Sequence, residues 1–128
     1  MNMGSKVLNI GIASREEIQA RTLAIVRGEL KVKPDDPKIW FNSIESLAQV
    51  LSSKNKLLLE LISQAKPESM THLATLSGRK MGNLSRTLHT MERYGLVELR
   101  KEASGVIRPL VPYSHVKLDL TLTLSQAA

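Results

Sequence analysis

The sequence contains no cysteine, which excludes disulfide bonds and thiolate metal sites and fits a reducing cytosol. Its three histidines, His72, His89 and His115, are far apart along the chain. A zinc site would therefore need carboxylate ligands, and no local spacing of acidic residues suggests one. We expect a protein that holds no metal and no other cofactor.

Aromatic side chains are also scarce, being limited to Trp40, Phe41, Tyr94 and Tyr113. Proteins that bind single-stranded nucleic acid usually stack the bases on aromatic side chains, so the composition argues against that class. The chain has no glycine-rich phosphate loop, no nucleophile elbow and no Ser/His/Asp spacing typical of hydrolases. We therefore expect that the protein is not an enzyme.

Long apolar runs are missing as well. None approaches the roughly 20 residues that span a bilayer, and the N-terminus lacks the apolar core of a secretory signal. These absences predict a soluble, cytoplasmic protein. A chain of 128 residues has the size of one domain, and it can bury roughly two thirds of its unfolded surface without covalent staples.

Positive charge is present but unevenly distributed. The formal net charge is +6, and residues 72–108 carry seven basic and three acidic side chains, whereas residues 43–71 and 109–128 are each neutral. A basic segment of this kind is expected of a protein that binds nucleic acid, although many basic proteins bind none. The charge therefore needs the support of a motif.

That motif lies in residues 69–97, which read as two short helices joined by a turn at Gly78 and ended by Gly95. In the second helix Leu84, Leu88 and Met91 follow the i, i+4, i+7 spacing of one buried stripe. Helical geometry places a second, polar and basic set on the opposite face: Gly82, Arg86, His89 and Arg93. The helix is predicted to pack on one side and to present charge on the other.

Residues 84–97 read LSRTLHTMERYGLV, a run with an apolar residue, Ser, Arg, two spaced leucines and a closing Gly-Leu-Val. This arrangement resembles the helix-turn-helix of winged-helix transcription regulators of the MarR and ArsR type. The likeness reaches from about Ser46 to Pro112. It implies that the helix at residues 80–93 enters the DNA major groove and that a hairpin at residues 99–109 lies along the phosphate backbone.

The resemblance and the helical geometry together identify candidate DNA contacts. Arg86 is the first of them, because a guanidinium can bind guanine O6 and N7, or a phosphate, through two hydrogen bonds. Asn83 could bind adenine and Ser85 a phosphate, while His89 is expected at the periphery of the contact or simply exposed. On the helix the candidates are Arg79, Lys80, Asn83, Ser85, Arg86 and His89. Each could instead be a solvated surface side chain, and His72 is expected to be a surface or capping residue.

On the hairpin the candidates are Arg100, Lys101 and Arg108. Side chains alternate along a strand, so we expect two of the three to contact the DNA backbone. The hairpin itself is predicted from two β-rich arms on either side of Ser104-Gly105. The alternative is a solvated hairpin with no ligand.

The N-terminal part is predicted to form an arm. Residues 6–12 alternate as a strand, and Ser14 with Glu17 is a capping box for a helix over residues 15–28, which could pack on its own sheet or on a second subunit. The proline-rich segment 31–38 is predicted to be a loop, and residues 39–41 a short strand.

The middle and the C-terminal end complete the pattern. Asn42 with Glu45 suggests a second capping box, followed by a helix that breaks at Lys54-Asn55. The leucine-rich residues 56–65 predict a helix buried on most sides, closed by Pro67, and Ser69 is predicted to cap the next helix. Residues 115–124 alternate strictly and predict a strand with one apolar face: Val116, Leu118, Leu120, Leu122 and Leu124. Residues 125–128 are expected to fray.

These elements predict an α+β fold: a winged helix-turn-helix at residues 39–112, with a strand-helix arm at 1–38 and a C-terminal strand and tail at 113–128. The predicted function is a homodimeric regulator that binds double-stranded DNA sequence-specifically and represses transcription. The alternative is an antitoxin that neutralises a protein partner, a toxin, through its arm or tail and also binds its own promoter. Residues 12–31, with the winged helix, resemble small predicted bacterial regulators of that kind.

Overall fold

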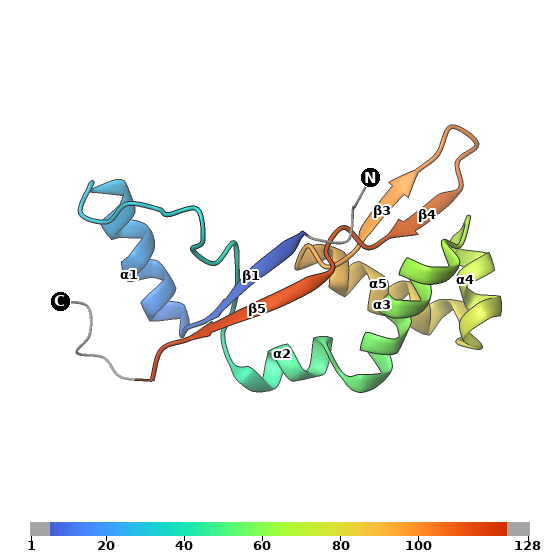
Figure 1. The fold of residues 1–128 in the computed structure, drawn as a ribbon, viewed down its shortest axis with the longest axis horizontal. Coiled ribbons are helices and arrows are strands. Elements are labelled where there is room, and N and C mark those ends of the chain that lie inside the picture. Colours follow the sequence, from blue (N-terminus) through green and yellow to red (C-terminus); the bar gives the residue numbers. More distant parts are fainter. Residues whose placement is uncertain (1–5, 123–128) are drawn as a thin grey trace. The chain divides into compact units, whose positions relative to one another are not determined.

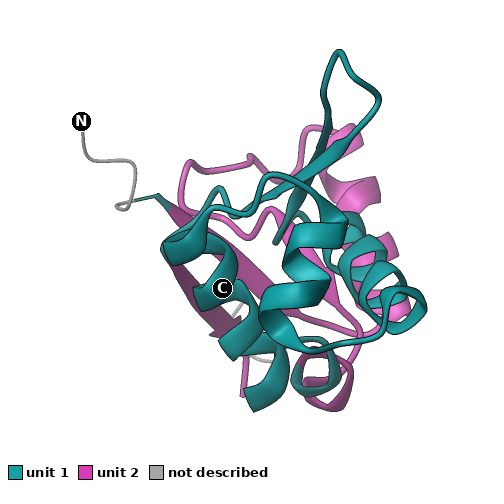
Figure 2. Ribbon diagram, turned by 90° about the vertical axis from the view of Figure 1, so that its right-hand side faces the viewer, with its two compact units in different colours: residues 1–6, 48–114 teal, residues 7–47, 115–128 magenta. Residues whose placement is uncertain are grey.

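The computed structural model describes residues 6–122 and has a mixed α+β fold (Figure 1). The chain divides into two compact units (Figure 2). Among the described residues, unit 1 contains Lys6 and residues 48–114, and unit 2 contains residues 7–47 and 115–122. We predicted boundaries near residues 38 and 112, but Ile39–Phe41 pairs with the N-terminal strand and therefore belongs to unit 2.

Unit 2 is built on a three-stranded sheet in the order β2-β1-β5. Its strands are β1 (Val7–Ile12), β2 (Ile39–Phe41) and β5 (His115–Leu120). Both neighbours run parallel to β1, and β5 pairs with it along its full length, from Val7 opposite His115 to Ile12 opposite Leu120. All three predicted strands are confirmed, although β5 ends at Leu120, and positions 123 and 124 of the predicted strand and the predicted tail 125–128 lie outside the described residues.

Helix α1 (Arg15–Val26) begins at the predicted capping box. The Ser14 hydroxyl accepts from the Glu17 amide at 3.1 Å, and the Ser14 amide donates to the Glu17 carboxylate at 2.7 Å. The hydrogen bond from the Ser14 amide holds the pKa of Glu17 below its ordinary value, because it favours the charged carboxylate.

A contact network connects α1 to β2 and to the loop before it. The Arg21 guanidinium lies 5.5 Å from the centre of the Trp40 ring and forms an ion pair with Asp36 at 3.2 Å. The Trp40 ring occupies the space in which Gly11 would carry a Cβ atom, at 2.4 Å from the ideal position. Helix α1 therefore contacts its own sheet.

Unit 1 contains helices α3 (Ser53–Ala65), α4 (Met70–Ser77) and α5 (Met81–Arg93), followed by an antiparallel hairpin of β3 (Glu98–Lys101) and β4 (Ile107–Leu110). Its buried apolar residues come from each of these helices and from the segment after α5: Leu58, Ile62, Leu73, Leu84, Leu88, Met91, Leu96 and Val97. The predicted stripe of α5 is therefore confirmed as core.

Three predictions around α2 (Ile44–Val50) and α3 are wrong in detail. The cap of α2 is Ser43, whose hydroxyl accepts from the Ser46 amide at 3.0 Å, so the expected pair Asn42 and Glu45 does not form a capping box. Helix α3 begins at Ser53 because Ser52 caps it, so the break precedes Lys54-Asn55. Only Leu58 and Ile62 of α3 are buried, and Leu57 is 64% exposed.

In residues 6–122, none of the helices combines the length and the apolar character that crossing a membrane requires.

Candidate nucleic-acid interface

A short turn joins α4 to α5. Helix α4 ends at Gly78, which adopts the left-handed conformation with φ 73° and donates its amide to the Ala74 carbonyl. Glycine is suited to this position because a side chain would strain that backbone conformation. Lys80 has extended backbone angles and precedes the first residue of α5, so only residues 78–80 separate the two helices.

Helix α5 has two contrasting faces. Leu84, Leu88 and Met91 are each 0% exposed. The candidate residues of its first turns are accessible: Lys80, Asn83, Arg86 and His89 are exposed, and Ser85 is partly exposed. Because the apolar stripe fixes the rotation of the helix about its axis, it also fixes which side chains face outward.

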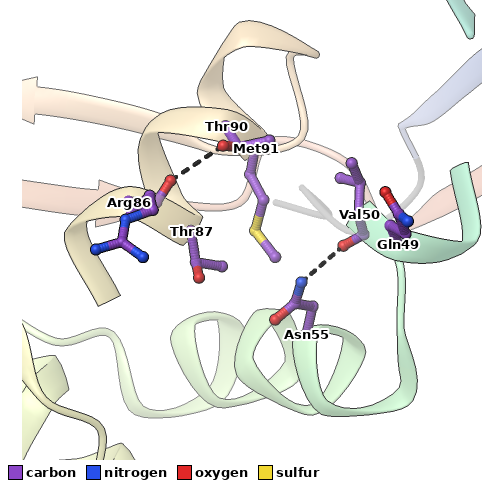
Figure 3. Close-up of a pocket in the computed structure, with 7 residues that line it drawn as sticks. All are labelled: Gln49, Val50, Asn55, Arg86, Thr87, Thr90 and Met91. Carbon is purple, nitrogen blue, oxygen red and sulfur yellow. Dashed lines mark hydrogen bonds between the residues drawn. The ribbon is translucent and has the colours of Figure 1, made fainter. Parts of the chain in front are cut away.

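Arg86 lies beside a pocket of about 250 Å³ in unit 1 (Figure 3). The other lining residues come from the end of α2, from α3 and from α5: Gln49, Val50, Asn55, Thr87, Thr90 and Met91. The Arg86 carbonyl accepts from the Thr90 hydroxyl at 3.1 Å, but its guanidinium forms no ion pair with any residue in 6–122. An arginine in this state needs no internal partner to be displaced before it binds an anion.

Ser85 and His89 interact with each other across one helical turn. His89 Nδ1 lies 2.7 Å from the Ser85 carbonyl oxygen and 3.3 Å from the Ser85 hydroxyl. A carbonyl oxygen can only accept, so Nδ1 carries the hydrogen and Nε2 of the neutral ring is an acceptor. The contact orients the imidazole along the exposed face of α5.

Arg79 differs from the other helix candidates because its guanidinium already has partners. One nitrogen donates to the Asn55 side-chain oxygen at 3.2 Å and another to the Lys54 carbonyl at 3.0 Å. Arg79 is only partly exposed, and its two hydrogen bonds connect the turn between α4 and α5 to the start of α3. The sequence could not reveal this contact, which joins residues more than twenty positions apart.

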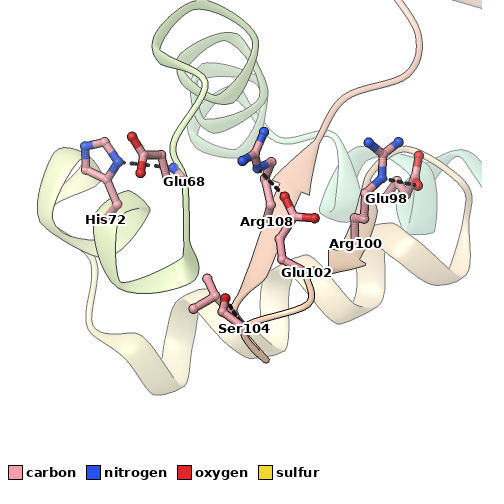
Figure 4. Close-up of polar contacts among 8 residues, drawn as sticks. Glu68, His72, Glu98, Arg100, Glu102, Ser104 and Arg108 are labelled. Atoms are coloured by element: carbon pink, nitrogen blue, oxygen red, sulfur yellow. Dashed lines mark hydrogen bonds and ion pairs between the residues drawn. The ribbon is translucent and has the colours of Figure 1, made fainter.

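The hairpin places two of its three candidates on one face. Arg100 lies directly opposite Arg108, whereas Lys101 lies opposite Ile107 and faces the other way. Each arginine has an acidic partner, Arg100 with Glu98 at 3.3 Å and Arg108 with Glu102 at 3.0 Å (Figure 4). Opposed like charges repel, and the carboxylates offset that repulsion.

Glu98 and Glu102 are site residues that the sequence analysis did not single out. For Glu98 the signal was present, because residues two apart on a strand share a face. Elsewhere, His72, which we expected to be a surface or capping residue, is exposed, and its Nδ1 accepts from the Glu68 amide at 3.2 Å, just before the cap of α4 at Ser69 (Figure 4).

The chain belongs to the HVO_A0114 family, whose model matches residues 50–118, more than half of its length. The matched segment begins at the end of α2, includes α5 and the hairpin, and ends within β5. No curated protein and no solved structure matches the chain.

Proposed function

We propose that unit 1 is a winged helix-turn-helix domain and that the protein is a dimeric, sequence-specific regulator that binds double-stranded DNA. The observation that carries the proposal is the division of α5 into a fully buried apolar stripe and an accessible polar face with an unpaired Arg86. A helix held in this way can enter a major groove with its first turns against the base edges.

The hairpin supports the same proposal as the wing of the domain. Arg100 and Arg108 lie on one face, where they can contact successive phosphates. The side chains of Arg100 and Glu98 are 54% and 49% exposed, so water already weakens their attraction. Exchange of an exposed carboxylate for a phosphate therefore costs little free energy.

Dimerisation is part of the proposal because a single winged helix contacts few base pairs. Two copies related by a twofold axis would place their recognition helices about one DNA turn apart, on a roughly palindromic operator. Occupation of a promoter in this way would block transcription sterically, so the expected effect is repression.

A second candidate is a protein-interaction module, for example an antitoxin that binds a toxin and its own promoter. The exposed apolar residues of α1 favour a protein contact there, since Leu23 is 52% and Val26 77% exposed. Strand β1, in contrast, lies in the middle of the sheet and is not available as a free arm. The two functions are compatible, and DNA binding is the one to test first.

The test is fluorescence anisotropy with two duplexes, one from upstream of the coding region and one scrambled, over a series of salt concentrations. At physiological salt we expect the protein to bind the native duplex at least about a thousandfold more tightly than the scrambled one. The affinity should fall steeply as the salt concentration rises. Arg86→Ala should weaken specific binding by about 1–3 kcal/mol, because it removes a bidentate contact.

The matched control is Arg15→Ala, which removes the same charge from an exposed position of α1 in unit 2. It should change the affinity far less than Arg86→Ala. Equal weak binding of both duplexes, with the two variants indistinguishable from the unmodified protein, would overturn specific recognition through α5.

A further inference from the structure

Strand β5 is an edge of its sheet, since the order of the described strands is β2-β1-β5. All six of its residues are exposed, and its apolar positions Val116, Leu118 and Leu120 are 39%, 47% and 38% exposed. The outer edge of such a strand offers backbone amides and carbonyls to any further strand. Soluble proteins usually protect long apolar edges, so this edge calls for an explanation.

The apolar face of β5 continues that of β1. Leu8 lies opposite Val116, Ile10 opposite Leu118 and Ile12 opposite Leu120. On β1 this face is buried, with Leu8 2% and Ile10 0% exposed, whereas on β5 it is open. A strand added beyond β5 would extend the same apolar face and cover its exposed residues.

The charges of β5 do not protect the edge against a second copy of itself. Lys117 and Asp119 are two residues apart and therefore share the other face of the strand. Apart from the backbone pairing with β1, neither side chain forms an ion pair or a hydrogen bond with another residue in 6–122. Charges of one sign would repel an identical strand, but this pair has opposite signs.

We propose that β5 pairs with β5 of a second copy in antiparallel orientation, about a twofold axis at Leu118. This proposal rests on the homodimer of the proposed function and states where that dimer forms. In this register Lys117 lies opposite Asp119 of the second copy, and Asp119 opposite its Lys117. On the apolar face Leu118 meets Leu118, and Val116 meets Leu120.

Charge complementarity selects this register over its alternatives. An axis at Lys117 or Asp119 places identical charges opposite each other, and an axis at Val116 or Leu120 leaves Asp119 opposite an uncharged residue. A parallel pairing about a twofold axis along the strands turns the second copy over, so its apolar face would lie on the side of Lys117 and Asp119 and would not continue the face formed by Val116, Leu118 and Leu120. Cross-strand pairs of opposite charge stabilise a sheet and like charges destabilise it, so the axis at Leu118 is preferred.

Twofold pairing also removes the edge in a closed assembly. The three strands of each copy would form one continuous sheet with the two β5 strands at its centre. Each copy uses its β5 edge once, so the contact closes and does not propagate into a filament. The exposed strand is thereby explained as half of an interface.

The experiment is sedimentation equilibrium of the full chain without DNA, on four proteins: unmodified, Lys117→Glu, Asp119→Lys and the double variant. The unmodified protein should dimerise. Each single variant sets like charges opposite each other twice per dimer, so its dissociation constant should rise roughly tenfold or more. The double variant restores both pairs with their signs exchanged and should dimerise about as well as the unmodified protein.

A mixture of the two single variants is the decisive sample, because one supplies two acidic positions and the other two basic ones. The mixture should form a heterodimer close to the unmodified affinity, which misfolded proteins could not do. Lys31→Glu, the same charge change in an exposed loop of unit 2, is the control and should have no effect.

A monomeric unmodified protein, or single variants that dimerise normally, would overturn this interface. A mixture of the two single variants that does not form a heterodimer would also overturn it. None of these results depends on DNA, so failure of the interface is distinguishable from failure of the proposed regulator, which the Arg86→Ala titration decides.

Discussion

Gly82 shows at the scale of a single residue how function and stability can oppose each other. It lies exposed in the first turn of α5, and a Cβ atom placed there would meet nothing within 4 Å. Glycine in a helix costs about 0.5–1 kcal/mol relative to alanine. Within residues 6–122, no neighbouring atom requires a glycine at this position, although glycine destabilises the helix. We therefore infer that the missing side chain leaves room for a ligand.

We predict that Gly82→Ala raises the free energy of unfolding by about 0.5–1 kcal/mol, measured by urea denaturation. The same change should weaken binding to the operator duplex, because the added methyl group separates α5 from the DNA. The affinity for DNA is measured by fluorescence anisotropy on the same preparation of the variant. A more stable variant with undiminished affinity would mean that this turn does not approach the DNA closely.

Single residues also mark the limit of what the sequence can predict at the site. The stripe of Leu84, Leu88 and Met91 follows from helical periodicity, so the outward position of Arg86 could be predicted. Arg79 has an equally basic side chain next to the same helix, yet it is bound to Lys54 and Asn55. Contacts between distant segments leave no periodic signal, so the two arginines look alike in sequence.

The hairpin of β3 and β4 makes a prediction at the scale of an element. Arg100→Ala and Arg108→Ala should each weaken DNA binding at all sequences and should each reduce the salt slope by about 1, as expected for one phosphate contact. Lys101→Ala is the matched control, because Lys101 faces the opposite side of the hairpin. Salt titrations of the three variants by anisotropy provide the measurement.

The stability of the hairpin should change little in these variants. Each substitution removes one ion pair with a carboxylate but also removes the repulsion between Arg100 and Arg108. Both effects on the free energy of unfolding are small, below about 1 kcal/mol. An equal loss of affinity in Lys101→Ala would contradict the assignment of one face to the phosphates.

Element boundaries were predicted well where a single local signal dominates. Helix α1 begins at its capping box because Ser14 and Glu17 have no competing neighbours. At α2, Asn42, Ser43 and Ser46 can all form local hydrogen bonds, and Ser43 is the cap in the structure. Such competition depends on backbone angles of single residues, which composition does not determine.

The burial of α3 shows a second limit at this scale. Its leucine-rich sequence predicts burial on most sides, but only Leu58 and Ile62 are buried. A small unit has few elements with which to cover a helix, so one stripe packs and Leu57 remains exposed. A high content of apolar residues identifies a helix that can be buried, but it does not determine how much of the helix surface is buried.

At the scale of the whole molecule, the topology of unit 2 was beyond prediction. Alternation revealed β1 and β5 separately, and the sequence analysis assigned them to an arm and a tail. In the structure they pair in parallel along their full length, although more than a hundred residues separate them. No short turn marks this parallel pairing, since the connection between the strands contains α1, β2, α2 and residues 48–114 of unit 1.

The predicted dimer axis can be located with one cysteine, because the chain contains none of its own. In the proposed pairing Leu118 lies opposite itself, at the Cα separation of about 4.5–5.5 Å that directly opposed antiparallel residues have. That separation lies within the range of a disulfide bond. Leu118→Cys should therefore form a covalent dimer on mild oxidation of dilute protein.

Val116→Cys is the matched control, since it lies on the same apolar face and is similarly exposed. Its counterpart in the second copy is displaced by four residues, roughly 13 Å along the strand, which no disulfide can span. Non-reducing electrophoresis over time should show rapid dimer formation for Leu118→Cys and little for Val116→Cys. Faster cross-linking of Val116→Cys would move the axis away from Leu118 and separate Lys117 from Asp119, and with them the charge argument for this dimer.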